Sequence, residues 1–586
     1  MALALLVILA TAAAFAQSPP VRSRHADSAK PQGRPAAGHP AVESGPARPG
    51  ASELTDRLSR ELPAAKPLPP RRQNYIDDFI FNKIEAAKIP HAGLAPDAEF
   101  FRRANLDLWG RIPDAEDVRK FLADPDPGKR EKLVDRLLGL DYKEKPGHDD
   151  YKGPWLVPDP FLAKWTYWFS DLFQNGPQGL EGRNAFRQYI HFFLKYNLPY
   201  DRIVREMLTA TALSAEFSGP ANFLIRNQVD GFRDADVMHE DTCDEIAVAS
   251  FKAFLGINLE CVSCHDGAGH LEKINLWLSQ RKREEFWRQA SFFGSIRVFR
   301  PALANQEFAL VEGPPLRPET HWTGGGDGYR TDAPSVLRIA RKKADVSPAF
   351  LLTGERPAAG ANPREEFARM LTGHPQFAKA TVNLTWSALM TVGIVDPPFG
   401  WDLARQDPKN PPPEPWTIQP SHPELLEALA ADFRKHNYDL RRLMRVIATS
   451  TAYQLSSRAE GPWKPEYDRF YARKLVRRLS AEEIYDAIAK ATGVFTPIQV
   501  AGTGKKVNYV METFGPNDVS EPGMRRFLDF FGQSNRKTAL PEARPGSIIQ
   551  AALMLNSDLV KGRVKASAKD STVQKLLSKE PPLGHE

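Results

Sequence analysis

Apolar residues recur at helical spacing along most of the chain after residue 73. The stretch "YIDDFIFNKIEAAKI" places Ile76, Phe79, Ile80, Ile84 and Ala87 on one face of a helix. The same spacing occurs in "AKWTYWFSDLF", "NAFRQYIHFFLKY", "PREEFARMLT", "QFAKATVNLTWSALMTVG", "SHPELLEALAADFRKHN", "DLRRLMRVIATSTAYQL", "SAEEIYDAIAKATG" and "SIIQAALMLNSDLV". Positions i, i+3, i+4 and i+7 lie on one side of an α-helix, so this pattern predicts amphipathic helices packed around a core. We therefore expect a mainly α fold.

The pattern divides the chain into two helical domains, at residues 73–296 and 363–565. A loop-rich connector at residues 297–362 joins them and contains two candidate short strands, "SIRVF" and "EFALVEG". Within the second domain, residues 495–535 form a looser insert. Residues 17–72 are rich in Pro, Ala and Gly and poor in large apolar side chains, so we expect a disordered linker there. Residues 566–586 are expected to form a flexible tail.

Three capping boxes mark predicted helix starts, namely Thr242 with Glu245, Ser421 with Glu424, and Ser480 with Glu483. In such a box the first side chain accepts a hydrogen bond from the backbone three residues later, and the acidic side chain accepts one in return. Gly256 is expected to end the helix that begins near Thr242, because glycine tolerates the left-handed conformation of a helix C-cap.

The first sixteen residues, "MALALLVILATAAAFA", form a short apolar run. Ala14-Phe15-Ala16 fits the small-residue cleavage site of a secretory signal, so residues 1–16 are predicted to be a signal peptide. Export to the periplasm or cell envelope is the expected location. No later stretch reaches about eighteen uninterrupted apolar residues, so no internal membrane span is expected.

The formal charge of +6 does not indicate a nucleic-acid-binding protein. Residues 17–72 hold ten Lys or Arg against five Asp or Glu, a surplus of five, and residues 1–16 hold no charged side chain. The rest of the chain is therefore nearly neutral, and it lacks the basic surface that a phosphate backbone requires. We expect no nucleic acid among the partners.

Two of the three cysteines lie in "LECVSCHDGAGH", residues 259–270, where Cys261, Cys264 and His265 form a C-x-x-C-H motif. Two thiols at this spacing match the two vinyl groups on one edge of a porphyrin, and the adjacent imidazole can ligate the iron. The motif therefore predicts one covalent haem c, with Cys261 and Cys264 as thioether anchors and His265 as the proximal ligand. A further helix, "HLEKINLWLSQRKREEFWRQASFF", is expected after it.

The sixth iron ligand decides whether such a site suits electron transfer or small-ligand chemistry. Met238, His239 and His270 are the candidates near the motif, although His270 lies only five residues after His265. Apolar residues at core spacing also lie close by and are candidates either for haem-pocket walls or for ordinary core, namely Phe251, Phe254, Leu255, Leu259 and Trp277.

Two other interpretations of the motif remain open. Zinc would take Cys261, Cys264 and His270, which are three donors where a structural site commonly has four. A Cys261–Cys264 disulfide is compatible with an oxidising compartment, although the βαβ frame of a thioredoxin-like site is not predicted. The remaining cysteine, Cys243, is expected to be a buried free thiol.

The chain resembles the planctomycete-type cytochrome-c-like proteins that pair the domains DUF1549 (PSCyt2) and DUF1553 (PSD1). The first resemblance, from about residue 75 to 293, rests on "FFRRANLDLWGRIPDAEDVRKFLAD", "REKLVDRLLG" and "FKAFLGINLECVSCHDG". The second, from about residue 364 to 560, rests on "FARMLTGHPQFAKATVNLTW", "GIVDP", "SHPELLEALAADF", "LRRLMRVIATSTAYQLSSR", "RRLSAEEIYDAI" and "QAALMLNSDLV".

This resemblance implies export, a CxxCH centre and a cell-envelope setting, often in bacteria that degrade complex polysaccharides. Many members continue the motif as C-H-x-H-P-F, whereas this chain continues it as Cys264-His265-Asp266-Gly267-Ala268. A role of that additional His-Pro is therefore not carried over, and neither is a charge role at Leu384, where an Arg is common.

Two functions follow from these observations. The first is an exported c-type cytochrome-like protein that exchanges electrons with a redox partner in the envelope or performs haem-linked redox chemistry itself. The second is a haem-free binding or scaffold protein of the envelope, related to polysaccharides, in which the CxxC is a disulfide or a metal clip.

Overall fold

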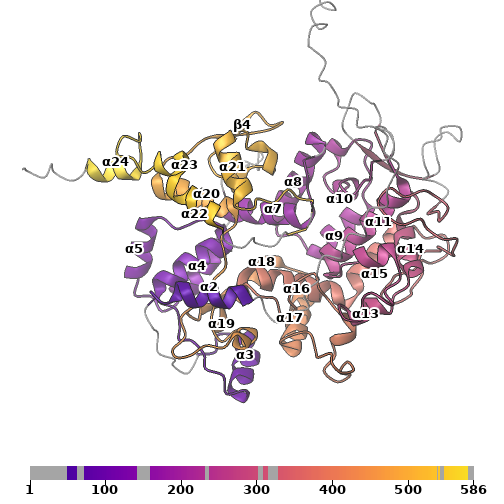
Figure 1. Ribbon diagram of the computed structural model, residues 1–586, viewed down its shortest axis with the longest axis horizontal. Coiled ribbons are helices and arrows are strands. Elements are labelled where there is room, and N and C mark those ends of the chain that lie inside the picture. The colour runs from indigo at the N-terminus through magenta and orange to yellow at the C-terminus, as the bar shows by residue number, and fades with distance from the viewer. Residues whose placement is uncertain are drawn as a thin grey trace, which may run out of the picture. The chain divides into compact units, whose positions relative to one another are not determined.

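The computed structural model describes residues 49–62, 71–140, 159–177, 179–230, 237–300, 308–313, 328–537, 539–540 and 547–578. The predicted signal peptide and the first part of the predicted linker lie outside these ranges. The described chain is mainly α, with two helical regions joined by a loop-rich segment, which confirms the predicted fold class (Figure 1).

The helices up to the connector are α2 (Pro49–Ser59), α3 (Tyr75–Ala86), α4 (Asp97–Trp109), α5 (Ala115–Ala123), α6 (Lys129–Leu137), α7 (Pro160–Leu172), α8 (Leu180–Lys195), α9 (Tyr200–Thr209), η1 (Ala215–Phe217), α10 (Asn222–Ile225), α11 (His239–Ser250), the π-helix η2 (Phe251–Leu255), α12 (Glu260–Cys264), α13 (Leu276–Ser279), α14 (Arg283–Ala290) and η3 (Ser291–Phe293).

The helices after the connector are α15 (Pro363–Gly373), α16 (Pro375–Met390), η4 (Leu403–Arg405), α17 (Pro423–Lys435), α18 (Leu440–Thr449), α19 (Thr451–Gln454), η5 (Pro465–Phe470), α20 (Ala481–Thr492), η6 (Val510–Glu512), η7 (Pro516–Asp518), α21 (Pro522–Phe530), α22 (Ile548–Asn556), α23 (Asp558–Lys561) and α24 (Thr572–Leu577).

Two short antiparallel ribbons interrupt the helices. β1 (Ile296–Phe299) pairs with β2 (Ala309–Glu312), with Ile296 opposite Glu312. These are the two strands predicted at the start of the connector, and the prediction is confirmed. β3 (Ile498–Val500) pairs with β4 (Lys505–Val507) inside the predicted loose insert, which also contains helix α21.

Of the three predicted capping boxes, one is confirmed and two are not. Ser480 and Glu483 form a capping box at the start of α20, as predicted. α17 instead begins after His422, whose side chain makes no capping hydrogen bond, with Pro423 in the first turn. The box expected at Thr242 is also wrong, because α11 already begins at His239.

Two segments predicted to be unstructured contain helices. Within the predicted linker, α2 packs onto the second helical region: Thr55 Oγ1 accepts a hydrogen bond of 2.9 Å from the Val476 N–H, and Arg473 Nη1 lies 2.6 Å from Asp56 Oδ1. Within the predicted tail, α24 contacts α20. The low apolar content of both segments hid these helices, since polar contacts hold much of α2 in place.

The two helical regions share one hydrophobic core. Buried side chains from α3 to α14 and from α15 to α19 form a single cluster, and the stacked rings of Tyr200 and Phe377, with centroids 5.7 Å apart, lie at their contact. A second, smaller cluster lies within α20, α21 and the loops between them. In Figure 1, α20 and α21 lie beside α7, which contacts η6.

Buried charges also join the two regions. Glu483 of α20 accepts hydrogen bonds from Arg477 Nη1 at 2.6 Å and from Lys164 Nζ of α7 at 3.3 Å. Arg477 Nε donates in turn to Asp107 Oδ1 of α4 at 3.0 Å. The side chain of Glu483 is 3% exposed, so this network crosses the contact between the regions in a place that water barely reaches.

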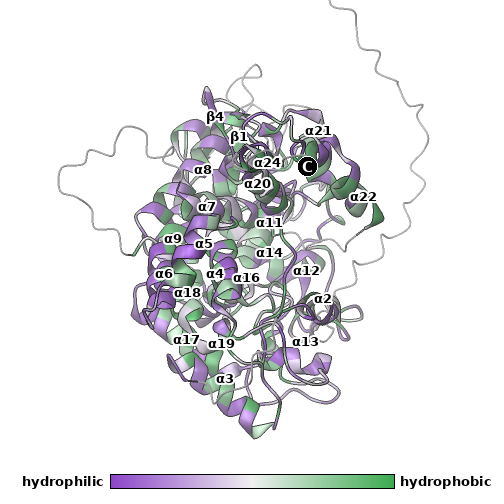
Figure 2. Cartoon of the chain, turned by 90° about the vertical axis from the view of Figure 1, so that its left-hand side faces the viewer, coloured by the Kyte–Doolittle hydropathy of each residue, from purple (hydrophilic) through white to green (hydrophobic). Residues whose placement is uncertain are grey.

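One described helix carries large apolar side chains in solvent. On α22, Ile548 is 89% and Leu555 is 70% exposed, and the helix is strongly green in Figure 2. Among the helices of the described ranges, none is both long and apolar enough to cross a bilayer.

Candidate functional site

The helix that precedes the cysteine motif changes from an α-helix to a π-helix. α11 passes into the π-helix Phe251–Leu255, and Gly256 then turns the chain with φ +70. A Cβ at Gly256 would lie 2.4 Å from Cδ1 of Trp401, so only glycine fits between the turn and that ring. The predicted end of the helix at Gly256 is confirmed, and α12, which carries the two cysteines, begins four residues later at Glu260.

Cys261 and Cys264 lie three residues apart on α12, and residues at this spacing share one face of a helix. Both are half-buried free thiols. Burial raises the pKa of Cys261, and the neighbouring Glu260 and Cys264 act in the same direction. Cys261 is thus protonated at neutral pH, which is the opposite of the lowered pKa that activates a redox CxxC thiol.

His265 is the C-cap of α12 and is half-buried. Its Nδ1 lies 2.8 Å from the carbonyl oxygen of Asp266. With a proton on Nδ1 this contact is a hydrogen bond that leaves the lone pair on Nε2, as in many metal-ligating histidines.

Ser263, between the two cysteines, holds α12 in place. Its carbonyl accepts a 3.0 Å hydrogen bond from Arg283 Nε, and its hydroxyl accepts one of 2.9 Å from Arg338 Nε. Arg283 also donates to the carbonyl of Ala340 at 3.0 Å. Both guanidinium groups are close enough to Cys264 to interact with it electrostatically. The end of the predicted connector therefore packs directly against the cysteine helix.

A buried ion network continues from Arg338 to α11. Arg341 Nη2 donates to Asp241 Oδ1 at 2.7 Å and to Asp244 Oδ2 at 2.6 Å, and all three side chains are 0% exposed. Burial raises the pKa of Asp244. Burial has the same effect on Asp241, but hydrogen bonds from Ser335 and Arg341 hold its pKa below the ordinary value. These contacts fix the connector across α11 and α12.

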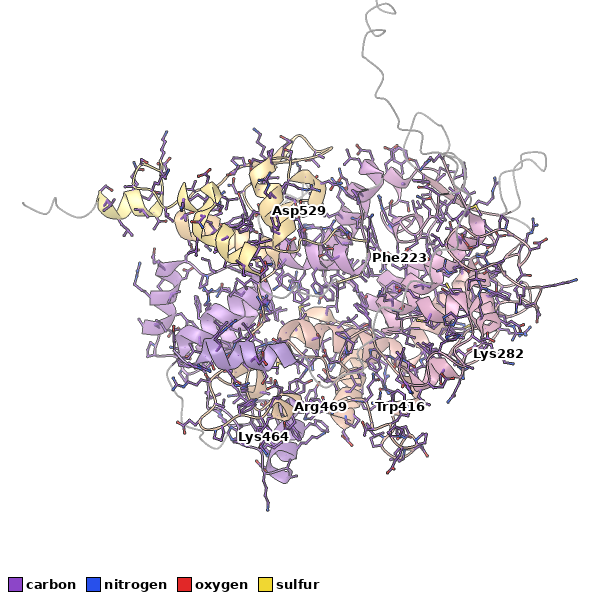
Figure 3. The ribbon with its side chains drawn as sticks, viewed as in Figure 1. Phe223, Lys282, Trp416, Lys464, Arg469 and Asp529 are labelled. Atoms are coloured by element: carbon purple, nitrogen blue, oxygen red, sulfur yellow. The ribbon has the colours of Figure 1, made fainter. Side chains whose placement is uncertain are left out.

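The chain after the motif differs from the single helix that was predicted. Residues 266–275 form turns, and two separate helices, α13 and α14, follow; Figure 3 labels Lys282 at the start of α14. Gly267 lies so close to Leu278 that a Cβ there would be 1.9 Å from its carbonyl oxygen. The carboxylate of Asp402 accepts hydrogen bonds from the Leu276 and Trp277 N–H groups at 2.7 and 2.9 Å. The 3.6-residue pattern was thus interrupted by a tight loop.

The three candidates for the sixth ligand lie in different surroundings. The rings of His270 and His265 have centroids 4.4 Å apart, so they are in contact and a porphyrin cannot lie between them as they stand. Met238 and His239 are 3% and 4% exposed. His239 Nε2 lies 3.1 Å from the Gly294 carbonyl oxygen, and burial lowers the His239 pKa to about 4. We assign none of the three to the iron.

Four of the five candidate wall residues belong to the core. Phe251, Phe254, Leu255 and Leu259 are 0% exposed, and Trp277 packs against the same cluster while remaining partly exposed. Cys243 is a buried free thiol, as predicted; its Sγ lies 3.3 Å from the Phe293 carbonyl oxygen. Within the described ranges, no group of three or more His, Cys, Asp or Glu residues is arranged to hold a metal ion.

The donor chemistry at α12 fits a covalent haem. Two thiols occupy one helix face, both are free, and the imidazole at the C-cap has its Nδ1 directed at a backbone carbonyl. A zinc ion would need further donors around the same thiols. Sequence reasoning found this triad, but it missed Arg283, Arg338 and Ser263, whose hydrogen bonds connect residues too far apart in the chain for any local pattern to reveal.

The fold and this site define a mainly α protein with a CxxCH helix held between two helical regions. Residues 75–297 match the family model PSCyt2, a protein of unknown function (DUF1549), and residues 363–580 match PSD1, a protein of unknown function (DUF1553). The chain belongs to the proteins that combine PSCyt2 and PSD1 domains, as its motifs predicted. No curated protein and no solved structure matches it.

Proposed function

We propose that this protein carries one covalent haem c on α12 and exchanges electrons with a redox protein in the cell envelope. Cys261 and Cys264 are the thioether anchors and His265 is the proximal ligand. The observation that carries the proposal is the placement of both free thiols on one helix face with the imidazole at the next position. The predicted signal peptide supports the location.

When bound, the haem supplies a one-electron redox centre. The chain's own residues hold and orient the attachment helix. Arg283 and Arg338 fix Ser263 by hydrogen bonds of 3.0 and 2.9 Å, so the face that carries the thiols keeps its orientation. With its proton on Nδ1, His265 donates to the Asp266 carbonyl 2.8 Å away, and this contact orients the ring.

The test is expression of the full chain in a host that attaches c-type haem. We expect a purified protein with one haem per chain, a Soret band that survives acid-acetone extraction, and a reversible one-electron potential. The double variant Cys261→Ser/Cys264→Ser should lose the covalent haem, whereas the matched variant Cys243→Ser should keep it, because that thiol is buried among core residues.

A colourless protein whose mass equals that of the polypeptide alone would contradict the haem proposal. That outcome would favour a haem-free envelope scaffold. Reaction of the two thiols with a maleimide would then show whether they are free or joined in a disulfide.

A further inference from the structure

A surface pocket lies between α2 and the loop that precedes η5. Its residues are far from the cysteine motif in the sequence. Its volume is about 470 Å³, and three arginines line it, Arg60, Arg458 and Arg473, together with Trp463 and Asp56. Lys464 and Arg469, labelled in Figure 3, mark this loop and η5. Volumes of this order are typical of small-molecule sites and exceed what a bare ion requires.

Arg473 is the lining residue that the surrounding side chains hold most firmly. It is 3% exposed, its Nη1 pairs with Asp56 at 2.6 Å, and its Nη2 donates to Ser52 Oγ at 3.1 Å. Its guanidinium lies 4.2 Å from the Trp463 ring centroid, and the indole N–H donates to Asp468 Oδ1 at 2.8 Å. The Nε of Arg473 is buried and has no hydrogen-bond partner. The contacts with Asp56 and Ser52 hold the Arg473 side chain rigidly in the wall of the pocket.

The charges that line the pocket favour an anionic ligand. Three arginines and one aspartate line the pocket, and the aspartate already pairs with Arg473. Arg458 is itself held in place by donating to the carbonyls of Arg60 and Leu62 at the end of α2. Arginine binds carboxylate, sulfate and phosphate oxygens through its planar fork, so this lining is suited to an oxyanion.

We propose that the pocket between α2 and residues 458–473 binds a small organic molecule through an oxyanion group that Arg60, Arg458 and Arg473 recognise. The pocket needs α2 as one wall. α2 and Arg60, which belong to the segment predicted as a linker, are therefore part of a binding site.

The experiment is calorimetric titration of the full chain with four sugars that share the glucose ring: glucuronate, glucose 6-sulfate, glucose 6-phosphate and glucose. We expect at least one of the three anionic sugars to bind and neutral glucose not to bind. The anion that binds most tightly identifies the preferred group as carboxylate, sulfate or phosphate. Added salt should weaken the binding, because the attraction is largely electrostatic.

Two variants and one control connect binding to these residues. Arg60→Gln and Arg458→Gln should each weaken binding about tenfold or more, as expected for a lost charge-assisted hydrogen bond. Arg57→Gln removes a charge from α2, three residues before Arg60, at a residue outside the lining and should leave binding unchanged. Circular dichroism and the unfolding midpoint show that each variant is folded. Binding of glucose as tight as that of the anions, equal effects of Arg57→Gln and Arg60→Gln, or no binding of any probe at millimolar concentration would each overturn the proposal.

Discussion

Glu483 provides a direct test of how the two helical regions are held together. Its carboxylate is buried and accepts hydrogen bonds from Arg477 and from Lys164 of the other region. Replacing it with glutamine keeps the size of the side chain and removes only the charge. Arg477 and Lys164 are then left buried with Asp107 as their remaining carboxylate partner within this network.

The size of the effect follows from the pKa of this carboxyl. Burial raises it, but the charges of Arg477 and Lys164 outweigh burial and lower the pKa of Glu483 from 4.5 to about 2. Each tenfold change in proton affinity corresponds to about 1.4 kcal/mol. Folding therefore stabilises the ionised carboxylate over the protonated carboxyl by about 3 kcal/mol. Loss of one partner of a buried ion pair costs a similar amount, about 3–5 kcal/mol.

The sign of the pH dependence is also fixed. A carboxyl whose pKa is lower in the folded state contributes its full stability above pH 4.5 and loses it as the pH falls toward 2. We therefore expect Glu483→Gln to lower the free energy of unfolding by about 3 kcal/mol at pH 7. The difference from the wild type should shrink steadily below pH 4.5.

The assay is urea unfolding followed by tryptophan fluorescence at pH 7, 5, 4 and 3. The control is Glu116→Gln, which breaks an exposed 2.6 Å pair with Lys120 on the surface of α5 and should change stability little. Equal losses in the two variants would refute the reasoning. So would a wild-type-to-variant difference that stays constant from pH 5 to pH 3.

Two further predictions concern the helix that leads to the cysteines. Burial lowers the pKa of His239 from 6.5 to about 4. Between pH 6.5 and pH 4 the unfolded chain therefore binds a proton that the folded chain does not. The free energy of unfolding of the wild type should fall by up to about 3 kcal/mol across this pH range. In urea titrations, His239→Gln should make the free energy of unfolding depend less on pH between 6.5 and 4. An unchanged pH dependence would contradict the lowered pKa of His239. Gly256→Ala should destabilise the protein by more than Gly354→Ala. Both glycines have positive φ, which costs about 1–2 kcal/mol for alanine. Only at position 256 would the added Cβ also lie 2.4 Å from Trp401. Equal melting-temperature shifts of the two variants would show that Trp401 moves without cost.

The sequence was informative where local physics decides the structure. Periodic apolar residues predicted most of the helices, and β1 and β2 formed at the two candidate strands of the connector. α2 was missed because its docking depends on Thr55 and Asp56 finding partners more than four hundred residues away. The late start of α13 was missed because Asp402, from beyond the connector, accepts hydrogen bonds from the first two N–H groups of this helix.

The same distinction applies to the candidate site. The spacing of Cys261, Cys264 and His265 is a local property, so the sequence identified the triad. Its support is non-local: Arg338 and Arg341 come from the connector, and the position of the Trp401 ring depends on the second helical region. No pattern within either domain could reveal these contacts, because each side chain is an ordinary arginine or tryptophan until the chain is folded.

This distribution of support has a consequence for how the protein is built. The PSCyt2 region contains the cysteine helix, but Trp401 fills the space beside Gly256 and Asp402 caps α13, and both belong to the PSD1 region. The connector adds Arg338, which donates to Ser263 between the two cysteines. A PSCyt2 region expressed alone would expose the surfaces that these residues cover and would lose the hydrogen bond from Arg338 to Ser263, while keeping the one from Arg283. The geometry of the candidate site is therefore a property of the paired domains, and this gives a physical reason for both to be present in one chain.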